Sequence, residues 1–238
     1  MESTAPLAPT LVIDGSSSEV FAGFIGTNQK WLCYSQEKGS PLECLFPAVE
    51  KLFQSTNSEL ADLKSYAYCE GPGSVLGLRL CAMAIQTWSH LHRKSACWYT
   101  YNSLQLTAAL ICMDTPDIQH ALLVSNWKKD AWHAVIVDKG KPEPVIVIQD
   151  SVVQNWSHGP LFYLPQRKNW QTIPKNATIL EYSPQRLTDV LHVLRHTKNL
   201  ELYTSGMNAF RKWTPERHRA AKPQPTSNIE HRIQGTDR

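Results

Sequence analysis

The segment that most constrains this 238-residue chain runs Glu70-Gly71-Pro72-Gly73-Ser74-Val75-Leu76-Gly77-Leu78-Arg79. It follows Tyr66-Ala67-Tyr68, which predicts a strand, and it precedes an apolar stretch that predicts a helix from Val75 to about His92. Glycine and proline mark the turn between them, and Ser74 is a typical helix N-cap. The helix is apolar on most sides, so we expect it to be buried or to face a partner.

The sequence on both sides of this turn has the patterns of further strands and helices. Three short strands joined by tight turns, which predict an antiparallel meander, come first: Leu11–Ile13, Val20–Ile25 and Trp31–Tyr34. Ser40-Pro41-Leu42-Glu43 then has the pattern of a capping box and begins a helix with one apolar face over Leu42–Gln54. After the central helix, the pattern predicts strands over 96–99, 120–124, 131–137, 145–148 and 177–182, and helices over 104–113 and from Ser183. Residues 149–175 give no clear pattern.

The composition excludes several classes of protein. Hydrophobic residues make up 42% of the chain, charged residues 19%, and the mean hydropathy is −0.33, which is unlike a disordered chain, a coiled coil or a disulfide-rich miniprotein. The uncharged window Ser95–Met113 is too polar for a membrane span, and Met1–Thr10 lacks the basic residues of a signal peptide. We therefore expect no association with a membrane.

Cysteine spacing indicates the redox environment. None of the six cysteines, which are Cys33, Cys44, Cys69, Cys81, Cys97 and Cys112, forms a C-x-x-C motif, so the usual zinc and redox signatures are absent. Most of them lie among apolar residues. This pattern is typical of buried, reduced thiols in a cytoplasmic protein.

The charge is concentrated at the end of the chain. Residues 209–238 hold seven Lys/Arg against three Asp/Glu, or +4, while the remainder holds seventeen against eighteen, or −1. The end of this basic tail is rich in Pro, Thr and charge, so we expect the tail to be largely disordered.

Two turns carry residues that could bind an anion. Asp14-Gly15-Ser16-Ser17 follows an apolar strand, and the glycine-rich turn leads into a helix N-terminus, where backbone amides are free. The second turn is not a Walker loop, because Leu78-Arg79 stands where Lys and Ser/Thr are needed, and Ser74 does not lie in G-x-S-x-G. Structural turns are the simpler interpretation. The residues of this vestigial nucleotide or anion turn are Asp14, Ser16, Ser17, Gly71, Gly73 and Ser74.

Other chemical motifs are weak. His192 and His196 are one helical turn apart, but the Glu of H-E-x-x-H is missing and no third metal ligand is apparent. Trp127 beside Lys128 could stack on a base, yet no signature of an RNA-binding module accompanies it. The residues alone thus offer no constellation of nucleophile, metal and base.

Taken in order, these segments resemble the TsaB (YeaZ) family, partners in making threonylcarbamoyladenosine in tRNA. The family's first strand ends in Asp-Thr-Ser/Ala, here Asp14-Gly15-Ser16-Ser17, and its first helix contains Leu-Pro, here within Leu45-Phe46-Pro47. The Ser-Leu that opens a later helix corresponds to Ser103-Leu104. The hallmark Gly-Pro-Gly-Ser-Phe-Thr-Gly-Leu-Arg matches at Gly71, Pro72, Gly73, Ser74, Gly77, Leu78 and Arg79. The resemblance covers about residues 11–110, and little of the family's next hairpin survives at 126–133, which indicates a divergent member.

This resemblance implies an α/β fold of the actin/Hsp70-like (ASKHA) type, built from two ribonuclease-H-like lobes. The first lobe would span residues 10–101 and carry the partner-binding helices. A second, smaller and divergent lobe would span 102–208, and the basic tail would span 209–238.

The resemblance also implies a function. The chain would be a non-catalytic scaffold that dimerises with TsaD in the cytoplasm and supports threonylcarbamoyladenosine modification of tRNA. It would hold no metal or cofactor by itself, and ATP or ADP would bind only at the interface with a partner. Expected partners are a TsaD-like protein, a TsaE-like ATPase, a second copy of the chain when alone, and tRNA, contacted indirectly or through the tail.

The partner surface of TsaB-like proteins lies on the helices that correspond to Leu42–Gln54 and Val75–His92. The interface residues expected here are Leu42, Leu45, Phe46, Val49, Val75, Leu78, Ala82 and Ile85. The alternative for the second helix is complete burial in the core.

Two other functions stay open. A small-molecule kinase or ATPase of the same fold would use Asp14 in its first phosphate turn, but it would need a matching glycine-rich turn after Leu110, where the sequence has none. A stand-alone RNA-binding protein would depend on the basic tail.

Overall fold

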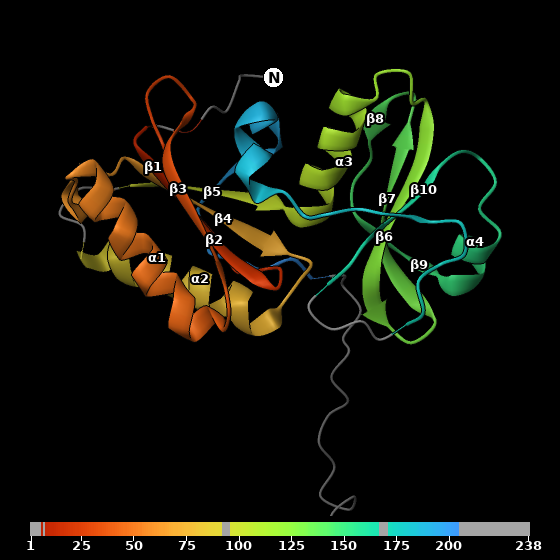
Figure 1. The fold of residues 1–238 in the computed structure, drawn as a ribbon, viewed down its shortest axis with the longest axis horizontal. Helices are drawn as coiled ribbons and strands as arrows, with labels where there is room; N and C mark the ends of the chain where they lie inside the picture. The colour runs from red at the N-terminus through yellow and green to blue at the C-terminus, as the bar shows by residue number, and fades with distance from the viewer. Residues whose placement is uncertain (1–5, 7, 92–95, 167–170, 205–238) are drawn as a thin grey trace, which may run out of the picture. The chain divides into compact units, whose positions relative to one another are not determined.

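The computed structural model describes residues 6, 8–91, 96–166 and 171–204. These residues form two six-stranded mixed sheets with helices packed on them (Figure 1). The basic tail 209–238, residues 1–5 and 7 of the expected lead, and the expected end of the central helix at His92 lie outside the described residues. Within the described residues, no helix is long and apolar enough to cross a membrane.

The first sheet has the strand order β12-β5-β4-β1-β2-β3. Strands β1, β4 and β5 are parallel, and β2, β3 and β12 run antiparallel to their neighbours. Parallel neighbours need a long crossover, which α2 provides between β4 and β5. The elements are Thr10–Asp14 (β1), Glu19–Ile25 (β2), Trp31–Lys38 (β3), Pro41–Thr56 (α1), Ser65–Gly71 (β4), Val75–Leu91 (α2), Cys97–Asn102 (β5) and Arg195–Thr197 (β12). The expected meander and both expected helices are confirmed.

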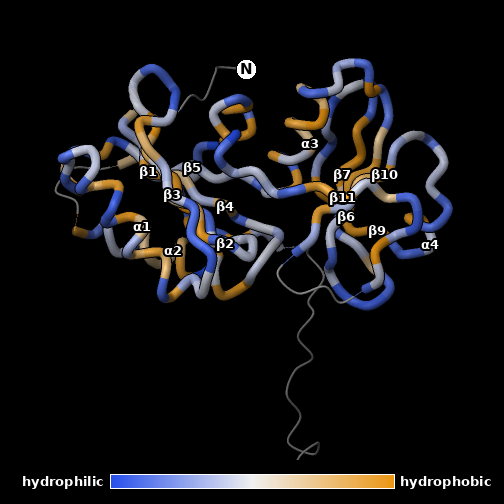
Figure 2. Tube along the Cα trace, viewed as in Figure 1, coloured by the Kyte–Doolittle hydropathy of each residue, from blue (hydrophilic) through white to orange (hydrophobic). Residues whose placement is uncertain are grey.

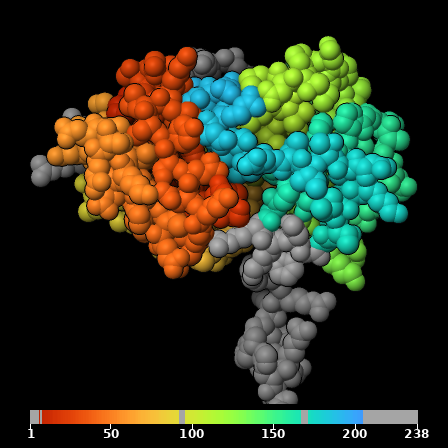
Figure 3. All heavy atoms as spheres, in the orientation of Figure 1, coloured from red at the N-terminus to blue at the C-terminus, as the bar shows by residue number. Residues whose placement is uncertain are grey.

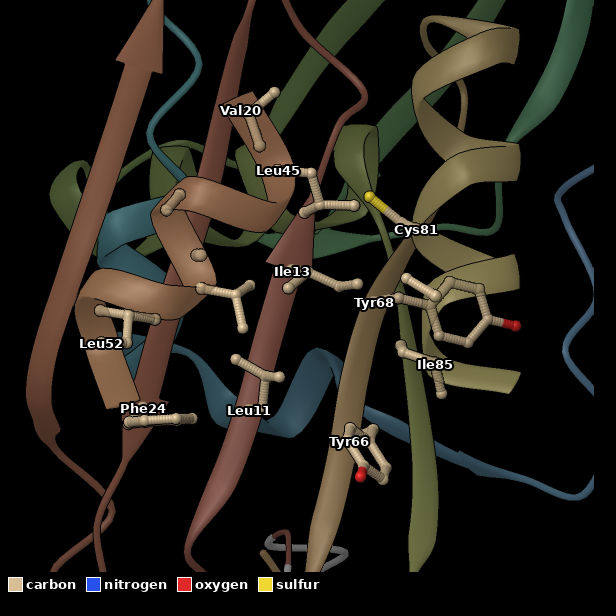
Figure 4. Close-up of a cluster of buried hydrophobic side chains, with 14 of the residues drawn as sticks. Leu11, Ile13, Val20, Phe24, Leu45, Leu52, Tyr66, Tyr68, Cys81 and Ile85 are labelled. Carbon is tan, nitrogen blue, oxygen red and sulfur yellow. The ribbon is translucent and has the colours of Figure 1, made fainter. Parts of the chain in front are cut away.

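Helices α1 and α2 lie side by side on one face of the first sheet (Figure 1). Leu45 of α1 and Ile85 of α2 are fully buried and point towards Leu11 and Ile13 of β1 (Figure 4). Burial of one such side chain stabilises a fold by roughly 1.5–3 kcal/mol. The shared core therefore fixes how both helices sit on the sheet.

The second sheet has the order β11-β10-β6-β7-β8, and β9 pairs with β7. The expected hairpin and the strand that follows it are confirmed, and the segment without a sequence pattern contains α4 and β10. The elements are Ser103–Asp114 (α3), His120–Lys128 (β6), Ala131–Asp138 (β7), Lys141–Pro142 (β8), Ile146–Gln149 (β9), Asp150–Gln154 (α4), Leu161–Leu164 (β10) and Thr178–Ile179 (β11). Hydrophobic stretches follow the strands of both sheets, whereas β3 at the edge is largely hydrophilic (Figure 2).

Helix α3 contributes to the cores of both sheets. Leu106 and Leu110 pack in a cluster of the first sheet, and Leu104 and Ala108 pack in a cluster of the second. A helix buried on opposite sides is apolar all round, which explains why this segment has no polar stripe.

The expected helix after Ser183 is wrong. The chain forms two 3₁₀ helices, Pro184–Asp189 (η2) and Leu191–Val193 (η3), separated by Val190 at φ −135°. Spacings of three and four between apolar residues fit such short turns as well as a regular helix. The chain then enters β12 and pairs with β5, so the expected second lobe, 102–208, includes a segment that returns to the first sheet.

Helix capping differs from the expected capping box at the start of α1, and two further caps form elsewhere. Ser40 makes no side-chain bond at the start of α1. Asn102 caps α3 by accepting bonds from two backbone amides. The short 3₁₀ helix Leu60–Asp62 (η1) has a reciprocal cap between Glu59 and Asp62. An adjacent polar residue can take over capping because the bond depends on local backbone geometry.

Candidate functional site: the Asp14 turn and the α1–α2 surface

Asp14 ends β1 as a carboxylate with only 1% of its surface exposed. Its Oδ1 accepts a bond of 2.7 Å from the backbone amide of Ser16. Its Oδ2 accepts bonds from the hydroxyls of Tyr101, at 2.7 Å, and Tyr182, at 2.5 Å. Three donors from three segments thus satisfy a buried charge that would otherwise be costly.

The two glycine-containing turns pack directly on each other. A Cβ on Gly77 would overlap the carbonyl oxygen of Gly15, and one on Gly73 would overlap that of Ser16. The backbone amide of Ser74 donates to the Ser16 carbonyl at 2.7 Å. The glycines of the hallmark therefore allow close approach between β1 and the start of α2.

The hydroxyls of Ser17 and Ser74 in these turns bond locally. Ser17 Oγ donates to the Glu19 carbonyl at 3.0 Å and accepts from the Glu19 amide at 3.2 Å. Ser74 Oγ accepts from the Gly77 amide at 3.4 Å, so the expected cap of α2 is confirmed. Both hydroxyls serve turn and cap geometry.

A metal–nucleotide does not fit the Asp14 turn as it stands. Two phenol hydroxyls already donate to the carboxylate oxygen Oδ2. The amide of Ser74 at the start of α2 donates to a backbone carbonyl and is not free for a phosphate. The two expected turns lie against each other, and the Asp14 carboxylate and the Ser74 amide bond within the chain, whereas the buried Ser16 hydroxyl has no hydrogen-bond partner among the described residues.

Burial changes the acidity of the groups around Asp14. Burial and the nearby carboxylate raise the pKa of Tyr101 and of Tyr182 well above the usual range. Burial, and to a smaller extent the charge of Asp14, also raises the pKa of the thiols of Cys69 and Cys81. These phenols and thiols stay protonated near neutral pH, so the phenols act as hydrogen-bond donors to the carboxylate.

A polar pocket of about 270 Å³ borders the outer side of this turn. Its walls are acceptor-rich and carry two carboxylates. The described lining residues are Ser17, Ser18, Glu19, Gln36, Pro165, Gln166, Leu180, Glu181 and Tyr182. Carboxylates disfavour a phosphate ligand at this wall.

The eight expected interface residues divide into two groups. Leu42, Phe46 and Val75 are exposed, at 58%, 48% and 60%. The other five are buried in the intramolecular core: Leu45, Val49, Leu78, Ala82 and Ile85. For these five the expected interface position is wrong, because that side of each helix packs on the sheet. The alternative for α2, burial in the core, is correct for its inner face.

A different row of α2 is exposed. Leu76, Met83 and Leu91 are exposed at 56%, 63% and 67%, and they lie on the side away from Ile85. Phe46 of α1 faces α2, because its ring contacts Trp88 edge-on at 6.1 Å between centroids. We call the exposed apolar side chains of the two helices the α1–α2 surface, which comprises Leu42, Phe46, Val75, Leu76, Met83 and Leu91.

The remaining sequence candidates lie apart from one another. His192 is in η3 and His196 in β12, where its ring contacts Tyr99, so they do not share a helix. The described residues contain no group of three or more His, Cys, Asp or Glu that could hold a metal. Lys128 lies 4.1 Å above the ring of Trp127, so this pair interacts within the chain.

Sequence reasoning missed Tyr101 and Tyr182 as partners of Asp14. Each lies in or near a predicted strand with nothing in the neighbouring sequence to mark it, and only long-range folding brings them to β1. It also missed Leu76, Met83 and Leu91, although their helical spacing away from Ile85 could have identified them.

Comparison with known proteins gives a consistent result. Residues 42–134 match the family model of TsaD, tRNA N6-adenosine threonylcarbamoyltransferase. The solved structure of YeaZ from Pseudomonas aeruginosa matches with a TM-score of 0.51 and 16% identity, over 65% of this chain and 74% of that one. An uncharacterised protein similar to peptidase YeaZ from Pseudomonas aeruginosa matches with a TM-score of 0.54 and 15% identity, over 76% of this chain and 89% of that one. No curated protein matches.

The fold is therefore the expected α/β, actin/Hsp70-like fold of two ribonuclease-H-like lobes. The family-model match includes the hallmark turn and the helix α2 that follows it. The match covers 93 of the 238 residues, and the likeness to the YeaZ structures shows the shared fold.

Proposed function

We propose that the chain is a non-catalytic TsaB-like subunit that binds a TsaD-like protein through the α1–α2 surface. The match to the TsaD family model and the fold shared with YeaZ support a role in forming threonylcarbamoyladenosine in tRNA. The observation that carries the proposal is the exposed apolar surface on the two helices. Without the TsaD-like protein, the same surface would pair two copies of the chain.

The α1–α2 surface consists of exposed apolar side chains on two helices that pack against each other. Its six apolar side chains are between 48% and 67% exposed, and they come from two adjacent helices. We infer that these side chains act together, since exposed apolar side chains that gather on one face typically mark an interaction site. Glu43, Glu50 and Arg79, which are exposed on the same helices, supply charged residues of the kind found at interface rims.

The helix pair also has a suitable shape for a partner helix. The ring of Phe46 lies between α1 and α2, where it contacts Trp88. Ridges of one helix pack into grooves of another, and large, flexible or aromatic side chains such as Met83 and Phe46 are typical anchors of protein interfaces. A helical segment of the partner would therefore pack along this pair.

The closed Asp14 turn supports a role without catalysis. Its carboxylate accepts three bonds from the chain itself, and the pocket beside it carries Glu19 and Glu181. Phosphoryl transfer needs cations and free amides around the phosphates. We therefore place the chemistry on the partner and assign binding to this chain.

Charge reversal on the α1–α2 surface tests the proposal. Phe46→Glu on α1 and Met83→Glu on α2 each place a carboxylate on the surface, while Leu32→Glu, at a residue 58% exposed on β3, is the matched control. Loss of an anchor costs at least about 2 kcal/mol, or roughly 30-fold in affinity. Isothermal titration of the full chain with a TsaD-like protein from the same organism measures this.

The two helix variants should lose at least 30-fold in affinity, and Leu32→Glu should bind like the wild type. Circular dichroism should show all three folded, because each side chain is about half exposed or more. Equal affinity of all variants, or no binding by the wild type, would contradict the proposal.

A further inference from the structure

The chain leaves the second sheet after β11 and returns to the first. We call residues 182–204 the return segment. Its helix η2 contacts both β2 and α3, and Figure 3 shows it in blue between residues of the first sheet and residues of α3. Leu187, Val190 and Leu194 are buried in a core cluster with Val12 of β1. The return segment is thus part of the packing of the first sheet.

Polar contacts fix the beginning of this segment at three places. The indole Nε1 of Trp31 in β3 donates to the backbone carbonyl of Gln185 at 2.5 Å. The hydroxyl of Tyr182 donates to Asp14 at 2.5 Å, and Arg186 donates twice to Asp114, at 2.6 and 2.8 Å. The pair Arg186–Asp114 is largely exposed, and such pairs contribute little. Asp14 is buried, and hydrogen bonds to a buried charge are among the strong ones.

The hydroxyl of Tyr182 occupies the place beside Asp14 that a group bound to this carboxylate would need. The oxygen Oδ2 of Asp14 accepts only from the hydroxyls of Tyr101 and Tyr182 among the contacts of the described residues, and Tyr182 also lines the polar pocket. A cation entering from that pocket would have to displace the Tyr182 hydroxyl to reach the carboxylate.

We propose that Tyr182 is an internal latch, whose hydroxyl occupies Asp14 in place of a bound metal–nucleotide and holds the return segment on the first sheet without any ligand. Asp14 then joins the end of β1 to Tyr182, a residue 168 positions later in the chain. This role is independent of the partner surface on α1 and α2, since no residue of that surface contacts the latch in the described contacts.

The latch is tested by removing one hydroxyl. Tyr182→Phe keeps the ring and loses the bond, and Tyr34→Phe removes the hydroxyl of a tyrosine that is 52% exposed. Loss of a bond to a charged group corresponds to roughly a tenfold or greater rise in local opening. Hydrogen exchange of backbone amides in residues 184–193, measured on the full chain, reports this opening.

In Tyr182→Phe these amides should exchange at least tenfold faster, and in Tyr34→Phe they should exchange at the wild-type rate. Equal exchange in both variants would overturn the latch. If Tyr182→Phe does not fold, hydrogen exchange of the wild type with a nucleotide added still tests the proposal. Magnesium with ATP should leave the exchange of residues 184–193 unchanged, whereas a ligand-induced change there would show that Asp14 accepts a bound group and would contradict the proposal.

Discussion

The hydroxyl of Tyr182 lies 2.5 Å from Oδ2 of Asp14, and Tyr101 donates to the same oxygen from β5 at 2.7 Å. These bonds join the end of the first strand to the segment that enters η2. Asp14, which the sequence places in a possible phosphate turn, therefore accepts hydrogen bonds that join segments of the fold. Loss of this carboxylate should therefore loosen the contact between β1 and η2.

The full chain alone should not hydrolyse ATP. Asp14 is bonded to its own neighbours, and the lining of the adjacent pocket includes two carboxylates. Release of inorganic phosphate from ATP and magnesium should be the same with the wild type and with Asp14→Ala. Metal-dependent turnover that disappears in Asp14→Ala would instead favour a kinase or ATPase.

Gly77→Ala should destabilise the protein strongly. Alanine normally favours a helix interior by about 1 kcal/mol over glycine, but here its Cβ would overlap the carbonyl oxygen of Gly15, which cannot move without shifting β1. We expect a loss of about 3 kcal/mol in the free energy of unfolding. Urea denaturation measures it, with Leu76→Ala on the exposed side of α2 as control.

A loss below about 1 kcal/mol in Gly77→Ala, or an equal loss in Leu76→Ala, would show that the two turns do not approach as closely as described.

The fold of the first sheet was predictable because its signals are local. The glycine turn at 71–74 and the apolar face of Leu42–Gln54 specify a turn and a helix from neighbouring residues alone. The segment after Ser183 was not predictable in this way. Its conformation depends on pairing of β12 with β5, about a hundred residues earlier in the chain, and on Asp14.

The candidate site was predictable in location and less so in detail. The hallmark residues identified the two turns, but their bonding partner Tyr182 is brought in by tertiary structure. On α2, hydrophobicity alone could not tell the inner row with Ile85 from the outer row with Met83, since both are apolar. Packing on the sheet determines which of the two rows is buried.

Stability should fall in mild acid because of His133. Burial lowers the pKa of this imidazole from 6.5 to about 4 in the folded protein. Below pH 6.5 the unfolded chain therefore binds a proton that the folded chain excludes, so the stabilising contribution is present at neutral pH and is lost as the pH falls towards 4. Between pH 7.5 and 5 the loss is about 2 kcal/mol.

His133→Phe, which keeps an aromatic ring beside Trp127 and Tyr203, removes this titration. Urea denaturation at both pH values should show the wild type losing about 2 kcal/mol more than the variant. Parallel pH dependence of the two proteins would contradict the burial of a neutral imidazole.

The two buried thiols should resist alkylation. Burial raises the pKa of Cys69 and Cys81, and the thiolate is the reactive form. Iodoacetamide at pH 8 should label Cys33 and Cys97, which are half-buried, well before these two. Peptide mass spectrometry resolves the sites, and rapid labelling of Cys81 without denaturant would mean that α2 is not seated on the sheet.

Hydroxyl-radical footprinting tests the central claim, the binding of a TsaD-like protein to the α1–α2 surface, most directly. Met83 and Met113 are both exposed, at 63% and 40%, but only Met83 lies on that surface. Addition of the TsaD-like protein to the full chain should slow oxidation of Met83 and Phe46 at least several-fold and leave Met113 and Tyr34 unchanged. Unchanged oxidation of Met83, or protection of Met113 instead, would contradict the account.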